Sequence, residues 1–201
     1  MSPAVYQVFE EICGEASIRG LVLEVGAVPG PDSLLRMACL RNVRHKIGIN
    51  LQGAQADEGC EIIGGNANEM SCFEDGRFEA VVCNATLEHD RYFWMTVAEI
   101  HRVTASGGLI VIGVPGYAGM GVANFAPRKS MLGRVLRFFA GRTGNDVLMA
   151  GTPTLGEHLF PGDYYRFTEQ AVREVLLGGL REIAVRKVMN PPRFIGWGRK
   201  P

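Results

Sequence analysis

The residues best suited to acid–base chemistry lie in one short polar segment near the C-terminal end. His158, Asp163, Tyr164 and Arg166 fall within nine residues, among aromatic side chains that could hold a small molecule. Because histidine titrates near neutral pH, His158 is our first candidate for a general base, and Tyr164 is a second catalytic candidate. The alternative is a structural segment, in which Arg166 pairs with a carboxylate and the tyrosines pack.

A glycine-rich turn is the strongest candidate for ligand binding. Gly26 and Gly30 directly follow the apolar run 21–25, and the whole chain holds 26 glycines. Glycine lets a backbone approach a ligand and adopt φ angles that other residues resist. Ligands bind at the carboxyl ends of strands in open parallel sheets. This spacing also fits a tight turn without a ligand.

Apolar runs alternate with helical patterns in the first two thirds of the chain, which is typical of a parallel α/β sheet. The predicted strands are 21–25, 46–50, 61–64, 78–83 and 109–114. The predicted helical stretches are 34–40, 91–103 and 169–177, the last capped by Thr168. Two closing strands, 182–188 and 193–198, are expected to pair antiparallel because their connection is short.

The alternation stops between residues 116 and 165. We predict that 116–165 is a lid inserted after the fifth strand, within a single domain spanning 1–201. Its basic segment 129–142 fits an amphipathic helix with solvated arginines. The same segment also fits contact with an anionic or lipid-like acceptor or a membrane surface.

Composition narrows the class of partner. Lys+Arg and Asp+Glu both count 21, so the formal net charge is zero, which argues against a nucleic-acid partner. The five cysteines form no C-x-x-C pair, so we expect no metal site and a reducing compartment. We find no signal peptide and no transmembrane segment, and expect a cytoplasmic protein. No oligomeric state is indicated.

Further motifs follow the glycine turn in a regular order. They are Ile47-Gly48-Ile49-Asn50, Gly65-Asn66-Ala67-Asn68-Glu69-Met70, Thr86-Leu87-Glu88-His89, Glu99-Ile100-His101-Arg102-Val103 and Gly107-Gly108. Over about residues 21–115, this order resembles the class I S-adenosylmethionine-dependent methyltransferases, in particular the type 11 branch. The resemblance implies a Rossmann-like three-layer sandwich with a mostly parallel seven-stranded sheet, the last strand antiparallel. It also implies S-adenosylmethionine as the cofactor.

The resemblance implies roles for five residues on the methionine side of the cofactor. Glu24 would lie near the methionine amino group, and Asn84 and Thr86 would line the methionine pocket. Gly26 and Gly30 would let the cofactor pass close to the backbone.

On the ribose and adenine side the resemblance implies four more cofactor-binding residues. Asn50, followed by Leu51, stands where the family carries an acid that holds the ribose hydroxyls, and Asn66 and Ala67 would face the adenine. An amide offers one acceptor and one donor group but no charge assistance. Val28 stands where the family commonly has another glycine, so the turn is expected to differ in shape.

The expected function is methyl transfer from S-adenosylmethionine to a small-molecule or saccharide-like acceptor. Such a transfer needs orientation more than a catalytic triad. His89 follows the fourth strand and is another candidate base, with a structural corner as its alternative role. A catalytically silent interaction domain with weak or lost cofactor binding is the alternative function. A nicotinamide-dependent enzyme is disfavoured because the first turn lacks G-x-G-x-x-G.

Overall fold

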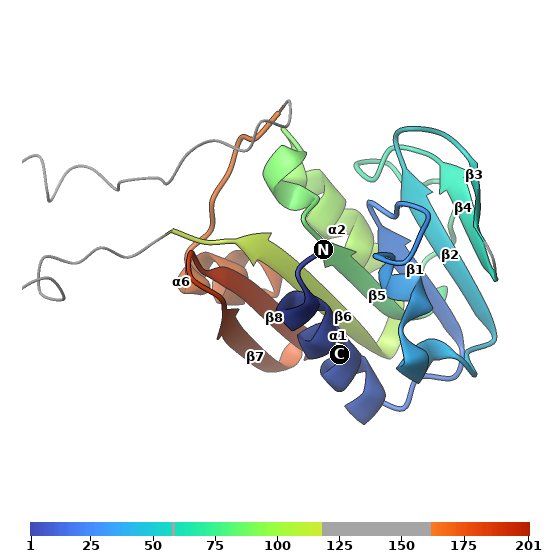
Figure 1. Cartoon of the computed structure of the whole chain (residues 1–201), viewed down its shortest axis with the longest axis horizontal. Helices are drawn as coiled ribbons and strands as arrows, with labels where there is room; N and C mark the ends of the chain where they lie inside the picture. Colours follow the sequence, from blue (N-terminus) through green and yellow to red (C-terminus); the bar gives the residue numbers. More distant parts are fainter. Residues whose placement is uncertain (58, 118–161) are drawn as a thin grey trace, which may run out of the picture.

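The structure is a computed structural model that describes residues 1–57, 59–117 and 162–201. The described strands are β1 (Leu21–Val25), β2 (His45–Asn50), β3 (Gln55–Asp57), β4 (Cys60–Gly64), β5 (Phe78–Asn84), β6 (Thr104–Pro115), β7 (Arg181–Val188) and β8 (Arg193–Arg199). They form one sheet in the order β3-β4-β2-β1-β5-β6-β8-β7 (Figure 1).

Two sets of helices and turns cover the sheet, giving three layers (Figure 1). One face is covered by the helix α1 (Pro3–Glu15) and the 3₁₀ turns η1 (Leu34–Arg36) and η2 (Ala38–Leu40). The other face is covered by α2 (Phe93–Val103), the short α6 (Glu169–Ala171) and the π-helical turn η4 (Val172–Leu176). The 3₁₀ turn η3 (Leu87–His89) follows β5.

The strand directions confirm the expected fold class. β4, β2, β1, β5 and β6 run parallel, and β8 runs antiparallel to both of its neighbours, β6 and β7. Seven strands therefore have the expected arrangement. The three-residue β3 pairs antiparallel with the edge strand β4 and is an addition that we did not predict.

The central strands are apolar because both sheet faces are covered. In β5, Val81 and Cys83 pack into the core under α2, whereas Ala80 and Val82 pack into the core under α1. This alternation follows from the two-residue period of a strand. Burial on both faces thus fixes the register of the strands whose ends build the site.

Three predicted helices differ from the structure in form. The stretch 34–40 makes two separate 3₁₀ turns, because Met37 between them is extended, with ψ 135°. The helix predicted at 91–103 begins at Phe93, since the Asp90 carboxylate accepts from the backbone N–H of Tyr92 (2.8 Å). Thr168 caps the last helix as predicted, but the helix continues as a π-helical turn.

Most of the predicted lid, 116–165, and all of its basic segment 129–142 lie outside the described residues. The two described flanks lie side by side, since Gly116 and Phe167 form an isolated parallel bridge. The Gly116 N–H also donates to the Pro192 carbonyl (2.8 Å), at the start of β8. In the described ranges, no helix has the length and apolar character needed to span a membrane.

Candidate functional site

All nine residues assigned to the cofactor lie along one edge of the sheet. The carboxyl ends of β4, β2, β1 and β5 are neighbours in that order. Asn66 and Ala67 follow β4, Leu51 follows Asn50 at the end of β2, Gly26 and Gly30 follow Glu24 of β1, and Thr86 follows Asn84 at the end of β5. The fold thus gathers positions that are 60 residues apart in the sequence.

The glycine turn packs tightly against the loop after β5. Gly26 has φ +79°, and a Cβ at this position would lie 2.0 Å from the Thr86 Oγ1. The Thr86 hydroxyl in turn donates to the Val25 carbonyl (3.2 Å). Gly30 also has a positive φ, +113°, but a Cβ there would meet no atom within 4 Å. Gly26 is therefore required for contact, whereas Gly30 is required only for backbone conformation.

The Glu24 carboxylate is buried and bound by its own chain. It accepts from the Ser33 hydroxyl (2.7 Å) and from the backbone N–H groups of Leu34 (3.2 Å) and Leu35 (3.3 Å). Burial raises the pKa of this carboxyl, and the three hydrogen bonds oppose that rise. The carboxylate therefore ties β1 to the first turn of η1.

Asn50 is likewise engaged within the protein. Its Nδ2 donates to the Ala27 carbonyl (2.5 Å), and its Oδ1 accepts from the backbone N–H of Gln52 (2.8 Å). One N–H and one lone pair remain for a ligand. Two exposed apolar side chains lie near the end of β2. Leu51 has 80% of its surface exposed and Val28 has 47%.

The loop after β4 is held in place by a polar network. The Asn66 Oδ1 accepts from the backbone N–H of Asn68 (3.0 Å). The Asn68 Nδ2 donates to the Asp90 carboxylate (2.7 Å) and to the Thr96 hydroxyl (2.9 Å). Because Asp90 and Thr96 lie at the start of α2, this network fixes the position of Asn66 and Ala67 relative to β5.

Asn84, at the end of β5, differs from the other two asparagines. Its Oδ1 is buried and has no hydrogen-bond partner among the residues that the structure describes. A Cβ on Gly113 would lie 2.4 Å from this oxygen and 2.9 Å from the Phe9 ring. The side chain therefore occupies the space that Gly113 leaves open. An acceptor oxygen without a donor is uncommon in a folded interior and is a candidate contact for a ligand.

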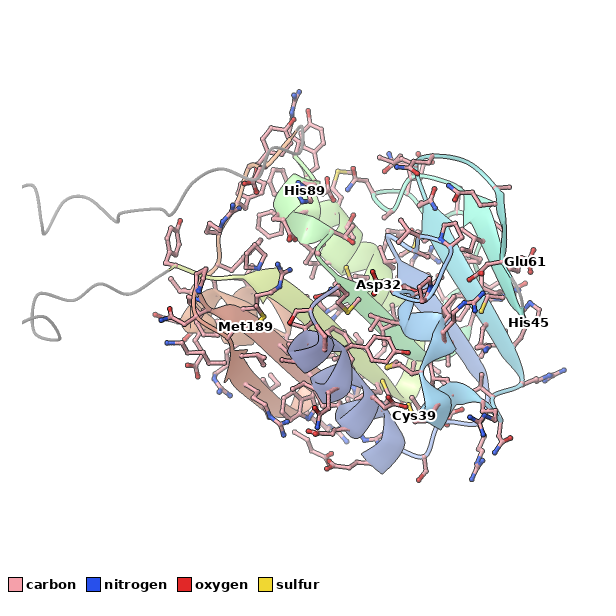
Figure 2. All side chains as sticks on the ribbon, in the orientation of Figure 1. Asp32, Cys39, His45, Glu61, His89 and Met189 are labelled. Atoms are coloured by element: carbon pink, nitrogen blue, oxygen red, sulfur yellow. The ribbon has the colours of Figure 1, made fainter. Side chains whose placement is uncertain are left out.

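The three candidate bases fall in different places. His89 ends η3, close to the N-terminal end of α2 (Figure 2). The Tyr164 phenol lies 3.3 Å from the Arg91 guanidinium, whose carbon is 5.5 Å from the centre of the Tyr164 ring. His158 lies outside the described residues.

Residues 162–167 are anchored to the loop after β5. The backbone N–H groups of Tyr164 (2.8 Å) and Tyr165 (3.2 Å) donate to the Glu88 carbonyl. Arg166 binds Asp163 through two hydrogen bonds, which raise the pKa of the guanidinium. This is the pairing that the structural interpretation of the segment expected.

The ion pair between Glu88 and Arg193 at this edge was not predicted from the sequence. The Glu88 carboxylate, 2% exposed, accepts through Oε1 from the Arg193 Nη2 at 3.3 Å. Its Oε2 is buried, and no described residue donates a hydrogen bond to it. Glu88 stood out in the sequence only as part of a motif, and Arg193 is 105 residues away. No local spacing could have joined them.

The motif Glu99-Ile100-His101-Arg102-Val103 has a structural role. The Arg102 guanidinium donates to the carbonyls of Met70 (2.9 Å) and Phe73 (2.9 Å) and to the Glu99 carboxylate (2.7 Å). The hydrogen bonds to the Glu99 and Asp75 carboxylates raise the pKa of Arg102, and the bonds to the two carbonyls hold the segment before β5 against α2. The motif therefore stabilises the packing of the elements that position the site.

A shallow hollow of about 170 Å³ lies away from this edge. It is lined by Ile12, Glu15, Ala16, Leu109, Glu182, Trp197, Gly198 and Arg199. Because Leu109 pairs with Arg199 at the end of β8, the hollow lies toward the opposite end of the sheet. The nine residues implied for the cofactor lie at the carboxyl edge.

Comparison with known proteins agrees with the geometry. Residues 32–112 match the family model of the methyltransferase domain, Methyltransf_11. No curated protein sequence matches the chain.

Solved structures share the fold at low sequence identity. The 1,6-didemethyltoxoflavin-N1-methyltransferase of Burkholderia thailandensis, solved with S-adenosylhomocysteine, has a TM-score of 0.64 and 16% identity over 98% of this chain and 78% of that chain. Phosphoethanolamine N-methyltransferase 2 of Haemonchus contortus, solved with S-adenosylmethionine, has a TM-score of 0.62 and 12% identity. The present chain is covered over 98% and spans about half, 52%, of that second protein.

The resemblance to type 11 S-adenosylmethionine-dependent methyltransferases is therefore matched by the family model over residues 32–112, and the solved structures show the same fold.

Proposed function

We propose that this chain binds S-adenosylmethionine across the carboxyl ends of β4, β2, β1 and β5 and transfers its methyl group to a small-molecule or saccharide-like acceptor. The observation that carries the proposal is the order of these strands. The positions implied for adenine, ribose and methionine follow one another along the edge. An extended nucleoside joined to an amino acid fits such a row.

The side chains at this edge fit the cofactor. Leu51 and Val28 offer exposed apolar surface where the adenosine would lie, and burying such surface favours binding. The remaining N–H and lone pair of Asn50 suit the ribose hydroxyls. The unpartnered Oδ1 of Asn84 suits the methionine ammonium.

Orientation is the main contribution of the protein to this reaction. S-adenosylmethionine supplies an activated methyl group and its own leaving group, so the chain must align the acceptor and accept a proton where one is released. Among the candidate catalytic residues, His89 ends η3 and the Tyr164 phenol contacts the Arg91 guanidinium at 3.3 Å. We also propose His158 as a general base.

The acceptor class and the compartment are part of the proposal. The zero net charge supports a small acceptor in place of a nucleic acid. All five cysteines are free, which supports a cytoplasmic, reducing environment.

Calorimetric titration with S-adenosylmethionine and S-adenosylhomocysteine tests this function. We expect dissociation constants in the micromolar range for both ligands. Gly30→Val, which places a side chain in the open space of the turn, should weaken both by about ten-fold or more while the protein stays folded. Arg44→Gln, an exposed change before β2, is the control and should leave binding unchanged.

A catalytically silent interaction domain is the second candidate. The engagement of Glu24 and Asn50 by their own chain favours it, because fewer polar groups remain for a ligand. Absence of heat and of a thermal shift with millimolar S-adenosylhomocysteine would select this alternative.

A further inference from the structure

The ion pair between Glu88 and Arg193 is incompletely satisfied. Its contact is long, 3.3 Å, and uses one oxygen of Glu88, while the second oxygen is buried and has no partner within residues 1–57, 59–117 and 162–201. An unpartnered carboxylate oxygen in a residue 2% exposed costs free energy unless a donor binds it. Such a group points to a ligand with a hydrogen-bond donor.

The Arg193 guanidinium has N–H donors that Glu88 does not use. Among the described residues, its guanidinium makes a single hydrogen bond, to Glu88, and its side chain keeps 17% exposure. Arg166 provides the contrast, because both of its Nη atoms bind the Asp163 carboxylate. The planar fork of Arg193 can therefore still take a carboxylate or phosphate group.

The pair lies beside the proposed cofactor site and outside it. Arg193 begins β8 opposite Pro115, the last residue of β6, so it stands at the carboxyl edge. Glu88 lies in η3, directly after the β5 loop that holds Asn84 and Thr86. The cofactor residues occupy the ends of β4, β2, β1 and β5, and the pair is next along that edge.

We infer that the Glu88–Arg193 pair recognises the methyl acceptor, which carries an anionic group and a neighbouring hydrogen-bond donor such as an amine. Arg193 takes the carboxylate or phosphate group through its free donors. Glu88 takes the donor through Oε2 and orients Arg193 through Oε1. This inference rests on the proposed methyltransferase function.

Matched probes test both halves of the recognition. We would titrate the protein, with and without S-adenosylhomocysteine, with β-alanine, propionate, propylamine, 3-aminopropylphosphonate and propylphosphonate. An amino acid or aminophosphonate should bind about ten-fold tighter than the probes that lack one of its two groups. Comparison of β-alanine with 3-aminopropylphosphonate tells whether the anion is carboxylate-like or phosphate-like.

Variants separate the two contacts. Arg193→Gln should weaken the anionic probes about ten-fold and leave propylamine unchanged, and Glu88→Gln should weaken the amine-bearing probes and leave propionate unchanged. Arg193→Lys, which keeps the charge without the fork, is the second variant should Arg193→Gln unfold. Arg44→Gln is the matched control, with an exposed arginine before β2.

The outcomes distinguish this inference from the proposed function. Binding of S-adenosylhomocysteine without any preference for the two-group probes, or without binding of any probe at millimolar concentration, overturns the acceptor assignment alone. Equal weakening of every probe in both variants also overturns it, because that result indicates a structural pair. Failure of S-adenosylhomocysteine to bind overturns the proposed function first.

Discussion

The two halves of the carboxyl edge treat their polar groups differently. At the ends of β1 and β2, the carboxylate of Glu24 and the amide of Asn50 are hydrogen-bonded to the protein's own backbone or side chains. At the end of β5 and in η3, Asn84 and Glu88 each keep a buried oxygen that has no hydrogen-bond partner among the described residues. The polar groups of the first set are hydrogen-bonded within the protein itself, whereas those of the second set need a ligand as a hydrogen-bond partner.

This difference separates folding from binding. Substitutions at the ends of β1 and β2 should lower stability, since they remove contacts within the chain. Substitutions of the unpartnered groups should lower ligand affinity with little effect on stability, because no internal bond is lost.

The largest effect is expected at Gly26. Gly26→Ala places a Cβ 2.0 Å from the Thr86 Oγ1 and forces alanine to φ +79°. Backbone strain and overpacking together should lower the unfolding free energy by about 2–5 kcal/mol. Urea unfolding measures the change.

Gly30→Ala is the control for this prediction. It has the same kind of strained φ but open space around its Cβ, so only the strain term, about 1–3 kcal/mol, should appear. Equal losses in the two variants would show that the contact with Thr86 does not matter.

Asn50→Asp should destabilise the protein by about 1–2 kcal/mol at neutral pH. The change removes the Nδ2 donor and places an oxygen against the Ala27 carbonyl. Because a protonated aspartic acid can donate in its place, the loss should shrink in acid. Urea unfolding at pH 4 and pH 7 tests this, and a variant more stable than wild type at pH 7 contradicts it.

Asn84→Ala should change the unfolding free energy by about 0.5 kcal/mol or less. The side chain has an unpartnered Oδ1, so no internal hydrogen bond is lost. The affinity for S-adenosylhomocysteine should still fall about ten-fold, measured by calorimetry. A large loss of stability with unchanged affinity would reverse the assignment of the two halves.

The smallest effect is a pH dependence at Glu24. Burial raises the pKa of this carboxyl above its ordinary 4.5, so the folded protein holds the proton more tightly than the unfolded chain. Its contribution to stability is therefore full at low pH and falls as pH rises through the raised pKa. The stability of wild type minus that of Glu24→Gln should decrease with rising pH. An increase over the same range would contradict the burial argument.

The sheet could be predicted from sequence because its strands are buried on both faces. The runs that became β1 and β5 match their predicted bounds to within one residue, whereas β6 contains the predicted 109–114 but already begins at Thr104. The helix α1 was missed, although Val5, Val8, Phe9 and Ile12 show its helical period. The stretch 34–40 has a similar apolar content but forms two turns, since Met37 between them has an extended backbone conformation.

The position of a site residue could be predicted only where that residue lies next to a predicted strand in the sequence. Glu24, Asn50 and Asn84 lie at the ends of strands that the sequence could identify and Gly26 follows one, so their gathering at one edge follows from the topology. What each side chain binds could not be predicted, because the partners come from turns. The Glu88–Arg193 pair joins η3 to β8 and depends on the packing of the whole sheet.

Hydrogen–deuterium exchange with and without saturating S-adenosylhomocysteine tests the central claim most directly. We predict slower exchange at the ends of four neighbouring strands, in residues 26–30, 50–53, 65–68 and 84–86, with no change around the hollow between α1 and β8. Protection confined to the region of that hollow, or no protection at any of the four strand ends, would contradict the account.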